Sequence, residues 1–295
     1  MKKIIIYGGK KLHGSISVSG SKNSSLAILA SSMLFEKKVV LKNIPVVEDI
    51  KTMIKLLIYL GKNIKIKKKT IEITNSKKFG KSFIAPYELV KTMRAGILVL
   101  GPLISKFKKA KVSLPGGCAI GARPIDLHLK FLKSIGVRNH IDKGYVISKL
   151  NNIKKKNIYR FQKISVGATI NSILASCLIP NKIILNNIAI EPEIIDLIKF
   201  LKKAGIKIKF LSNRKIEILG KKHLNQISYE IMPDRIEAGT YMIASAITNS
   251  KLTIKKLNIN HVQNTINYLS KANIKVKKID KNSVQILPGK IKPVS

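Results

Sequence analysis

The sequence has little of several residues that often mark a specialised function. Among 295 residues it has no tryptophan, 2 cysteines, 5 histidines and only 15 acidic residues. Cys118 and Cys177 lie far apart and fit neither a metal motif nor a disulfide framework, which is typical of a reducing compartment. The histidines are scattered as well. We therefore expect no metal site, no cofactor and no disulfide.

Long apolar runs are also missing. The basic start at residues 1–7 is followed by glycines and lysines, so its apolar stretch is too short for the core of a signal peptide. The longest apolar run, residues 95–104, contains glycine and proline and falls well below the ~18 residues of a membrane-spanning helix. We expect a buried helix there, and a cytoplasmic protein that binds no membrane.

Positive charge, by contrast, is abundant. The 56 lysines and arginines give a formal net charge of +41, and they occur from one end of the chain to the other. This spread indicates that the basic residues occupy solvated surface positions, as in proteins encoded by AT-rich genes. It argues against one concentrated surface for binding nucleic acid. Aromatic residues make up only 5%, so stacking partners for bases are few. We rank a nucleic-acid binder last, and expect the charge to attract anionic substrates.

A repeat of about 70 residues runs along the chain. Each unit has an apolar helix, a short β-branched strand, an amphipathic helix that ends at glycine or asparagine, and further strand. The pattern is clear in residues 27–66, 173–208 and 243–276, and looser in residues 97–137. It predicts an α/β fold in which sheets pack on central helices.

Two kinds of motif indicate chemistry. The string PGGCAIGARP at residues 115–124 predicts an exposed loop that places the Cys118 thiol near Arg123, although a lone loop cysteine is often inert. Three helix starts carry a basic residue beside small polar groups: Lys22, Arg94 and Lys163. Such starts suit an anion. Ordinary N-capping is the alternative, and it explains the serines and threonines but not the cations.

These segments resemble those of the UDP-N-acetylglucosamine 1-carboxyvinyltransferases, a family of enolpyruvyl transferases. The resemblance extends to residues 85–95, 165–169, 191–194 and 233–240. They match in order and spacing across the whole chain. The cysteine loop is the most specific match, because the relatives that act on shikimate 3-phosphate lack it. The resemblance implies an inside-out α/β barrel of βαβαββ units in two domains. Residues 22–232 would form a complete three-unit domain, and residues 1–21 and 233–295 an incomplete second one.

By resemblance, the family moves the enolpyruvyl group of phosphoenolpyruvate to the 3-hydroxyl of UDP-N-acetylglucosamine and releases phosphate. This step belongs to peptidoglycan precursor synthesis, and so to cell-wall growth, shape and division. Cys118 matches the general acid, which forms a phosphoenolpyruvate adduct and is alkylated by fosfomycin, whereas we expect Cys177 to be inert in an apolar helix. The matched substrate-binding residues are Lys22, Asn23, Arg94, Arg123, Pro124, Ile125, Asp126, Leu127, Lys163, Ile164, Ser165 and Val166.

The family's C-terminal third has no counterpart in these 295 residues. That part supplies the aspartate proposed as general base and the arginines that close on phosphate, and Asp234 is no substitute. Two alternatives to an active enzyme therefore stay open. The chain could be an inactive fragment that retains nucleotide-sugar binding, or a separate C-terminal fragment could complete it.

Overall fold

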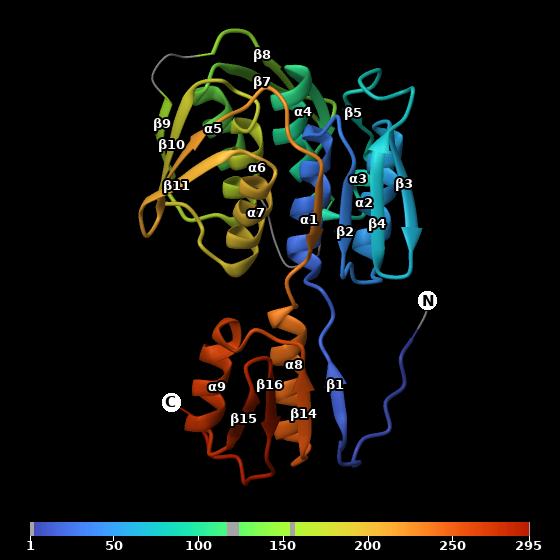
Figure 1. Cartoon of the computed structure of the whole chain (residues 1–295), viewed down its shortest axis with the longest axis vertical. Helices are drawn as coiled ribbons and strands as arrows, with labels where there is room; N and C mark the ends of the chain where they lie inside the picture. The colour runs from blue at the N-terminus through green and yellow to red at the C-terminus, as the bar shows by residue number, and fades with distance from the viewer. Residues whose placement is uncertain (1–2, 117–123, 154–156, 295) are drawn as a thin grey trace. The chain divides into compact units, whose positions relative to one another are not determined.

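The computed structural model describes residues 3–116, 124–153 and 157–294 (Figure 1). The chain divides into two compact units: unit 1 is Met1–Ser21 with Met232–Ser295, and unit 2 is Lys22–Ile231. Within the described ranges, no helix is long and apolar enough to cross a membrane. Cys118 and Arg123, which carry the most specific motif, lie outside the described residues.

Unit 2 contains three successive repeats. The first holds α1 (Lys22–Ser31), η1 (Ser32–Leu34), β2 (Val39–Lys42), α2 (Glu48–Tyr59), β3 (Lys62–Lys67) and β4 (Thr70–Asn75). The second holds β5 (Ile84–Ala85), α3 (Tyr87–Val90), η2 (Arg94–Val99), α4 (Leu100–Phe107), β6 (Lys109–Ser113), α5 (Asp126–Ser134), β7 (Val137–Asp142) and β8 (Tyr145–Leu150). The third holds β9 (Asn157–Arg160), α6 (Val166–Ser176), β10 (Lys182–Asn186), α7 (Pro192–Lys203), β11 (Lys207–Ser212) and β12 (Lys215–Leu219), and is followed by β13 (Ile227–Glu230).

Unit 1 contains a fourth repeat. Its elements are β1 (Ser15–Ser17), α8 (Arg235–Ile247), β14 (Leu252–Lys255), η3 (Ile259–Val262), α9 (Gln263–Lys271), β15 (Val276–Asp280) and β16 (Ser283–Ile286). Asp234 caps α8, because its carboxylate accepts hydrogen bonds from the backbone N–H groups of Ile236 and Glu237 at 2.8 and 3.2 Å. This contact gives Asp234 a local structural role.

The four sheets formed by the described residues share one topology. Their strand orders are β13-β2-β4-β3, β5-β6-β8-β7, β9-β10-β12-β11 and β1-β14-β16-β15. In each sheet the first pair of strands is parallel and the other two pairs are antiparallel. This recurrence confirms the predicted repeat and the predicted α/β class.

The ends of the amphipathic helices also follow the sequence prediction. After α2, α5, α7 and α9 the chain turns through a left-handed residue: Gly61, Gly136, Gly205 and Asn273, with φ of 96°, 103°, 99° and 66°. Glycine adopts this conformation without strain and asparagine tolerates it better than most residues, so these positions end the helices.

The buried helix expected at residues 95–104 is divided. A 3₁₀ segment, η2, precedes α4, and Pro102 lies in the first turn of α4. Proline has no N–H to donate and is tolerated only in the first turn of an α-helix. The α-helix therefore begins at Leu100, which places Pro102 in its first turn, and residues 94–99 form the separate 3₁₀ segment.

Apolar helices form the centre of unit 2. In Figure 1, α1 and α6 lie between the sheet containing β2 and β4 and the sheet containing β9 and β10. Every residue of α1 from Ser24 to Ser31 is buried, as is every residue of α6 from Ala168 to Ser176. One continuous apolar core joins the three repeats. Burial of each large side chain contributes about 1.5–3 kcal/mol, so unit 2 has the means to fold by itself.

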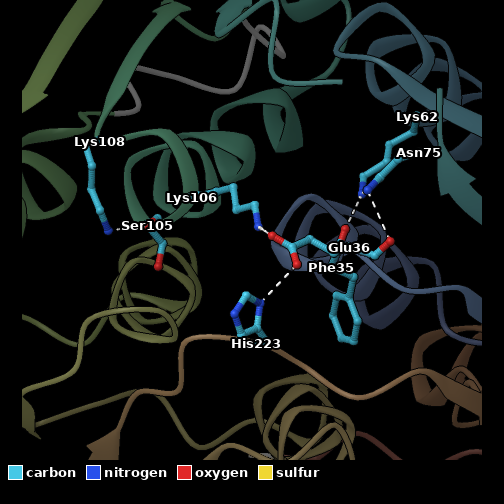
Figure 2. Close-up of polar contacts among 8 residues, drawn as sticks. All are labelled: Phe35, Glu36, Lys62, Asn75, Ser105, Lys106, Lys108 and His223. Carbon is cyan, nitrogen blue, oxygen red and sulfur yellow. Dashed lines mark hydrogen bonds and ion pairs between the residues drawn. The ribbon is translucent and has the colours of Figure 1, made fainter. Parts of the chain in front are cut away.

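A polar cluster joins the same three repeats near the helix ends, as Figure 2 shows. The Glu36 carboxylate lies 2.5 Å from Nζ of Lys106 and 3.0 Å from Nδ1 of His223, so each repeat contributes one residue. The hydrogen bond from Lys106 is the main cause that lowers the pKa of Glu36. The cluster links the three repeats, and we interpret it as a structural contact.

Lys62 is a buried lysine beside this cluster. Its Nζ donates to the carbonyl oxygen of Phe35 at 2.9 Å and to Oδ1 of Asn75 at 2.6 Å (Figure 2). The same atom lies 4.1 Å from the centre of the Phe79 ring. Burial, helped by the charge of Lys106, lowers its pKa from 10.5 to about 7. The folded protein therefore releases a proton that the unfolded chain keeps.

We expect the free energy of unfolding to rise between pH 7 and pH 9, because unfolded Lys62 is protonated throughout that range while folded Lys62 loses its proton above about pH 7. Below the folded pKa both states hold the proton, so the cost of burying the charge is fully present. The slope would reach at most about 1.4 kcal/mol per pH unit. Urea unfolding of Lys62→Met should show a flatter profile, and Lys65→Met, exposed on the same strand, should keep the wild-type slope. Equal slopes in all three proteins would contradict the expectation.

Candidate active site

The site predicted from the sequence falls on the starts of three helices and on the loop before α5, all in unit 2. Cys118 and Arg123 are outside the described residues, so their placement and roles stay predictions. The structure describes the other eleven predicted residues.

The described base of the cysteine loop packs against the segment that leads to Arg94. A Cβ built on Gly116 would lie 1.6 Å from the carbonyl oxygen of Lys91, so only glycine allows this approach of the two backbones. Two segments that the sequence marked separately therefore meet in the fold. Lys91 itself pairs with Glu88 at 2.5 Å.

Lys22 and Asn23 open α1 next to solvent. Nζ of Lys22 lies 2.9 Å from Oδ2 of Asp49, which stands in the first turn of α2, and the two side chains are 44% and 38% exposed. An ion pair this exposed contributes at most about 1 kcal/mol. An anionic ligand can therefore compete with Asp49 for the Lys22 ammonium.

The start of α5 holds four predicted contacts in different settings. Pro124 and Asp126 are exposed, Leu127 is half-buried, and Ile125 is buried at 9% exposure. Asp126 forms an exposed pair with Lys130 at 3.7 Å. Ile125 therefore supports the helix start from beneath, and its side chain offers little surface to a ligand.

The start of α6 contains both a capping residue and exposed residues that a ligand could contact. Oγ of Ser165 accepts a hydrogen bond from the N–H of Ala168 at 3.3 Å, so N-capping accounts for this serine. Lys163, Ile164 and Val166 are exposed around it. The cap does not explain Lys163, which precedes the positive end of the helix.

His128 connects these segments. It is 7% exposed on α5, and its Nδ1 lies 2.8 Å from Nδ2 of Asn171 on α6. Burial, and then the positive charge of Arg94, lower its pKa from 6.5 to about 4, while Asp126 acts in the opposite direction. Arg94 at the start of η2 and Asp126 at the start of α5 thus both act electrostatically on this buried imidazole.

Sequence reasoning missed two residues of this region, Asp49 and Asn171. Asp49 looked like an ordinary acidic residue in a first helical turn, and Asn171 lies inside an apolar run. A buried asparagine in the middle of an apolar helix is the signal that could have revealed a polar network. Among the described residues, no group of three or more His, Cys, Asp or Glu side chains could hold a metal ion.

Cys177 lies where the sequence indicated an inert thiol. It follows the last residue of α6, is fully buried, and its Sγ contacts the carbonyl oxygen of Ile173 at 3.2 Å. Burial raises its pKa, which keeps it a thiol.

Comparison with known proteins places this arrangement among enolpyruvyl transferases. A sequence model of the family described as EPSP synthase (3-phosphoshikimate 1-carboxyvinyltransferase) matches residues 6–295. The chain is 50% identical over 291 residues to the UDP-N-acetylglucosamine 1-carboxyvinyltransferase of Pelagibacter ubique, a match that covers 98% of this chain and 69% of the relative. It is 46% identical over 298 residues to that of Rickettsia prowazekii, covering 100% and 70%.

Solved structures agree on the fold. The enolpyruvyl transferase NikO from Streptomyces tendae matches with a TM-score of 0.81 at 18% identity, over 96% of this chain and 67% of that structure. EPSP synthase from Acinetobacter baumannii matches with a TM-score of 0.72 at 16% identity, over 95% and 65%. The fold is therefore that of these transferases over about two thirds of their length.

Proposed function

This chain belongs to the enolpyruvyl transferase family as a homologue of UDP-N-acetylglucosamine 1-carboxyvinyltransferases, and we propose that it serves the same reaction. The enolpyruvyl group of phosphoenolpyruvate passes to the 3-hydroxyl of UDP-N-acetylglucosamine, and phosphate leaves. The product feeds peptidoglycan synthesis in the cytoplasm. The observation that carries the proposal is the identity of 50% and 46% to two such enzymes across nearly the whole chain.

The chemistry proceeds by addition and elimination. Cys118 gives a proton to the methylene carbon of phosphoenolpyruvate while the sugar hydroxyl passes its own proton to a base and its oxygen bonds to the neighbouring carbon. Loss of a proton from the new methyl group and of phosphate from the neighbouring carbon then restores the double bond. A cysteine can act as this acid when nearby cations and a bound anion set its pKa, and fosfomycin-type inhibitors would react at the same sulfur.

Cations and helix starts hold the two substrates in this scheme. Lys22 and Asn23 bind phosphoenolpyruvate, with Arg94 and Arg123 supplying further positive charge. Residues 123–127, which lead into the start of α5, and residues 163–166, at the start of α6, bind the nucleotide sugar. The exposure of Asp126, Lys163 and Val166 supports this assignment, because each side chain is available to a ligand.

We further propose that unit 1 needs more repeats to form a working second domain. One face of α8 carries exposed apolar side chains: Ile236, Ile243 and Ile247 are 51%, 51% and 67% exposed. The corresponding helices α1 and α6 of unit 2 are buried along most of their length. Two further repeats, as in a three-repeat domain, would cover α8 in the same way.

A binding protein without turnover is the second candidate, and the self-contained core of unit 2 favours it. All the nucleotide-sugar residues named above lie in that unit. Binding and turnover therefore need separate tests.

We expect UDP-N-acetylglucosamine to bind the 295-residue chain weakly, and Arg123→Ala to reduce the affinity by about tenfold or more, because a charge-assisted hydrogen bond contributes about 1.5–3 kcal/mol. Titration calorimetry at millimolar ligand would measure both. Arg138→Ala, an exposed arginine on β7, is the matched control and should bind as the wild type does. No heat from a folded wild-type chain, or equal affinity in both variants, would count against the proposal.

A further inference from the structure

Asn171 is a buried side chain whose orientation is fixed by three contacts. It is 1% exposed. The N–H of Gly101 donates to its Oδ1 at 2.7 Å, and its Nδ2 donates to the carbonyl oxygen of Ile97 at 2.9 Å. These bonds from α4 and η2 distinguish the oxygen of the amide from its nitrogen. Nδ2 is therefore the atom that lies 2.8 Å from Nδ1 of His128.

This orientation determines the tautomer of His128. Since Nδ2 of Asn171 is a donor, Nδ1 of His128 must accept, and the proton of the neutral ring is on Nε2. A charged ring would place two N–H groups against each other. Burial and the nearby Arg94 also keep the imidazole neutral near pH 7.

The other edge of the ring lies against the start of α6. A Cβ built on Gly167 would be 3.3 Å from both Cε1 and Nε2 of His128. Gly167 thus leaves just enough room for the imidazole between the two helices. One histidine and one asparagine connect η2, α4, α5 and α6 in this way.

We propose that His128 and Asn171 are positioning residues for the nucleotide-sugar site, and that they hold the starts of η2, α5 and α6 in one arrangement. Arg94, Asp126 and Ser165 begin these three elements or cap them. Neither His128 nor Asn171 touches the reacting atoms. The inference rests on the proposed function for the identity of the ligand, and on the hydrogen-bond network for the mechanism.

The test compares four variants of the full chain. His128→Leu removes the acceptor and should weaken UDP-N-acetylglucosamine binding by about tenfold or more, since small displacements of positioned groups have effects of this size. His128→Asn can place an oxygen near the former Nδ1 and should restore most of the affinity. Asn171→Asp replaces the donor with an acceptor, so it should draw a proton onto Nδ1. His140→Leu, exposed on β7, is the matched control and should bind normally.

Nitrogen NMR of the imidazoles gives a readout that does not depend on binding. His128 in the wild type should show the Nε2–H tautomer without titration between pH 5.5 and pH 8, and Asn171→Asp should change that signature. An Nδ1–H tautomer in the wild type, or full affinity in His128→Leu, would overturn the proposal. A wild type with the expected tautomer that binds no nucleotide sugar would show instead that the proposed function fails, and the positioning role with it.

Discussion

The 295-residue chain should release phosphate from phosphoenolpyruvate and UDP-N-acetylglucosamine only at the background rate, and turnover should appear when the part of its relatives that it does not match is supplied. The apolar face of α8 in unit 1 is exposed, and the chain matches only 69% of the Pelagibacter ubique relative. Catalysis needs two substrates held in register away from water, which the proposed incomplete second domain does not achieve. A phosphate-release assay with and without a polypeptide carrying the unmatched part of that relative measures the effect.

In the completed enzyme, Cys118→Ala should lower the rate by about 10²- to 10⁴-fold, the usual contribution of a positioned acid. Cys177→Ala is the matched control, because that thiol is buried after α6 and should not affect turnover. Robust turnover by the 295-residue chain alone would refute the need for more repeats. The family assignment would stand in that case.

Asp196→Ala should lower the free energy of unfolding by about 2–5 kcal/mol, the second large effect we expect. Asp196 is 6% exposed on α7 and accepts hydrogen bonds from the hydroxyl of Ser24 on α1 and, at 2.7 Å, from that of Tyr229 on β13. Its removal leaves buried donors without this acceptor and opens a cavity between the repeats.

Urea unfolding followed by far-UV circular dichroism measures this effect, since the chain has no tryptophan to report by fluorescence. Asp196→Asn keeps the shape and one acceptor, so its loss should be smaller. Asp142→Ala, exposed at the end of β7, is the control and should unfold like the wild type. A loss below about 0.5 kcal/mol for Asp196→Ala, the range of ordinary surface changes, would show that the network contributes little.

The likeness among repeats explains why so much of the fold could be predicted. Periodicity of apolar residues identified the buried helices, and the glycine or asparagine after each amphipathic helix marked where that helix ends. The division of residues 95–104 into η2 and α4 was not predicted, although Pro102 gave the reason for it in the sequence.

Residues of the candidate site could be predicted only where the residue type and its neighbours along the chain indicate a chemical role. A basic residue at a helix start indicates an anion, so Lys22, Arg94 and Lys163 could be named from local sequence. The ion pair of Lys22 with Asp49 could not, because two exposed residues 27 positions apart carry no local sign that they will meet.

The sequence by itself determined the repeat, the class of each element, the buried face of each helix and, through its motifs, the family. These features are local, because propensity, capping and periodicity act within a few turns of the chain. Only the tertiary structure decided which buried polar groups would become partners. Asn171 meets His128 across 43 positions, and Ser24 meets Asp196 across 172. Apolar patterning specifies that a side chain is buried but not what it faces, and a buried polar atom takes its partner from the packing of distant helices.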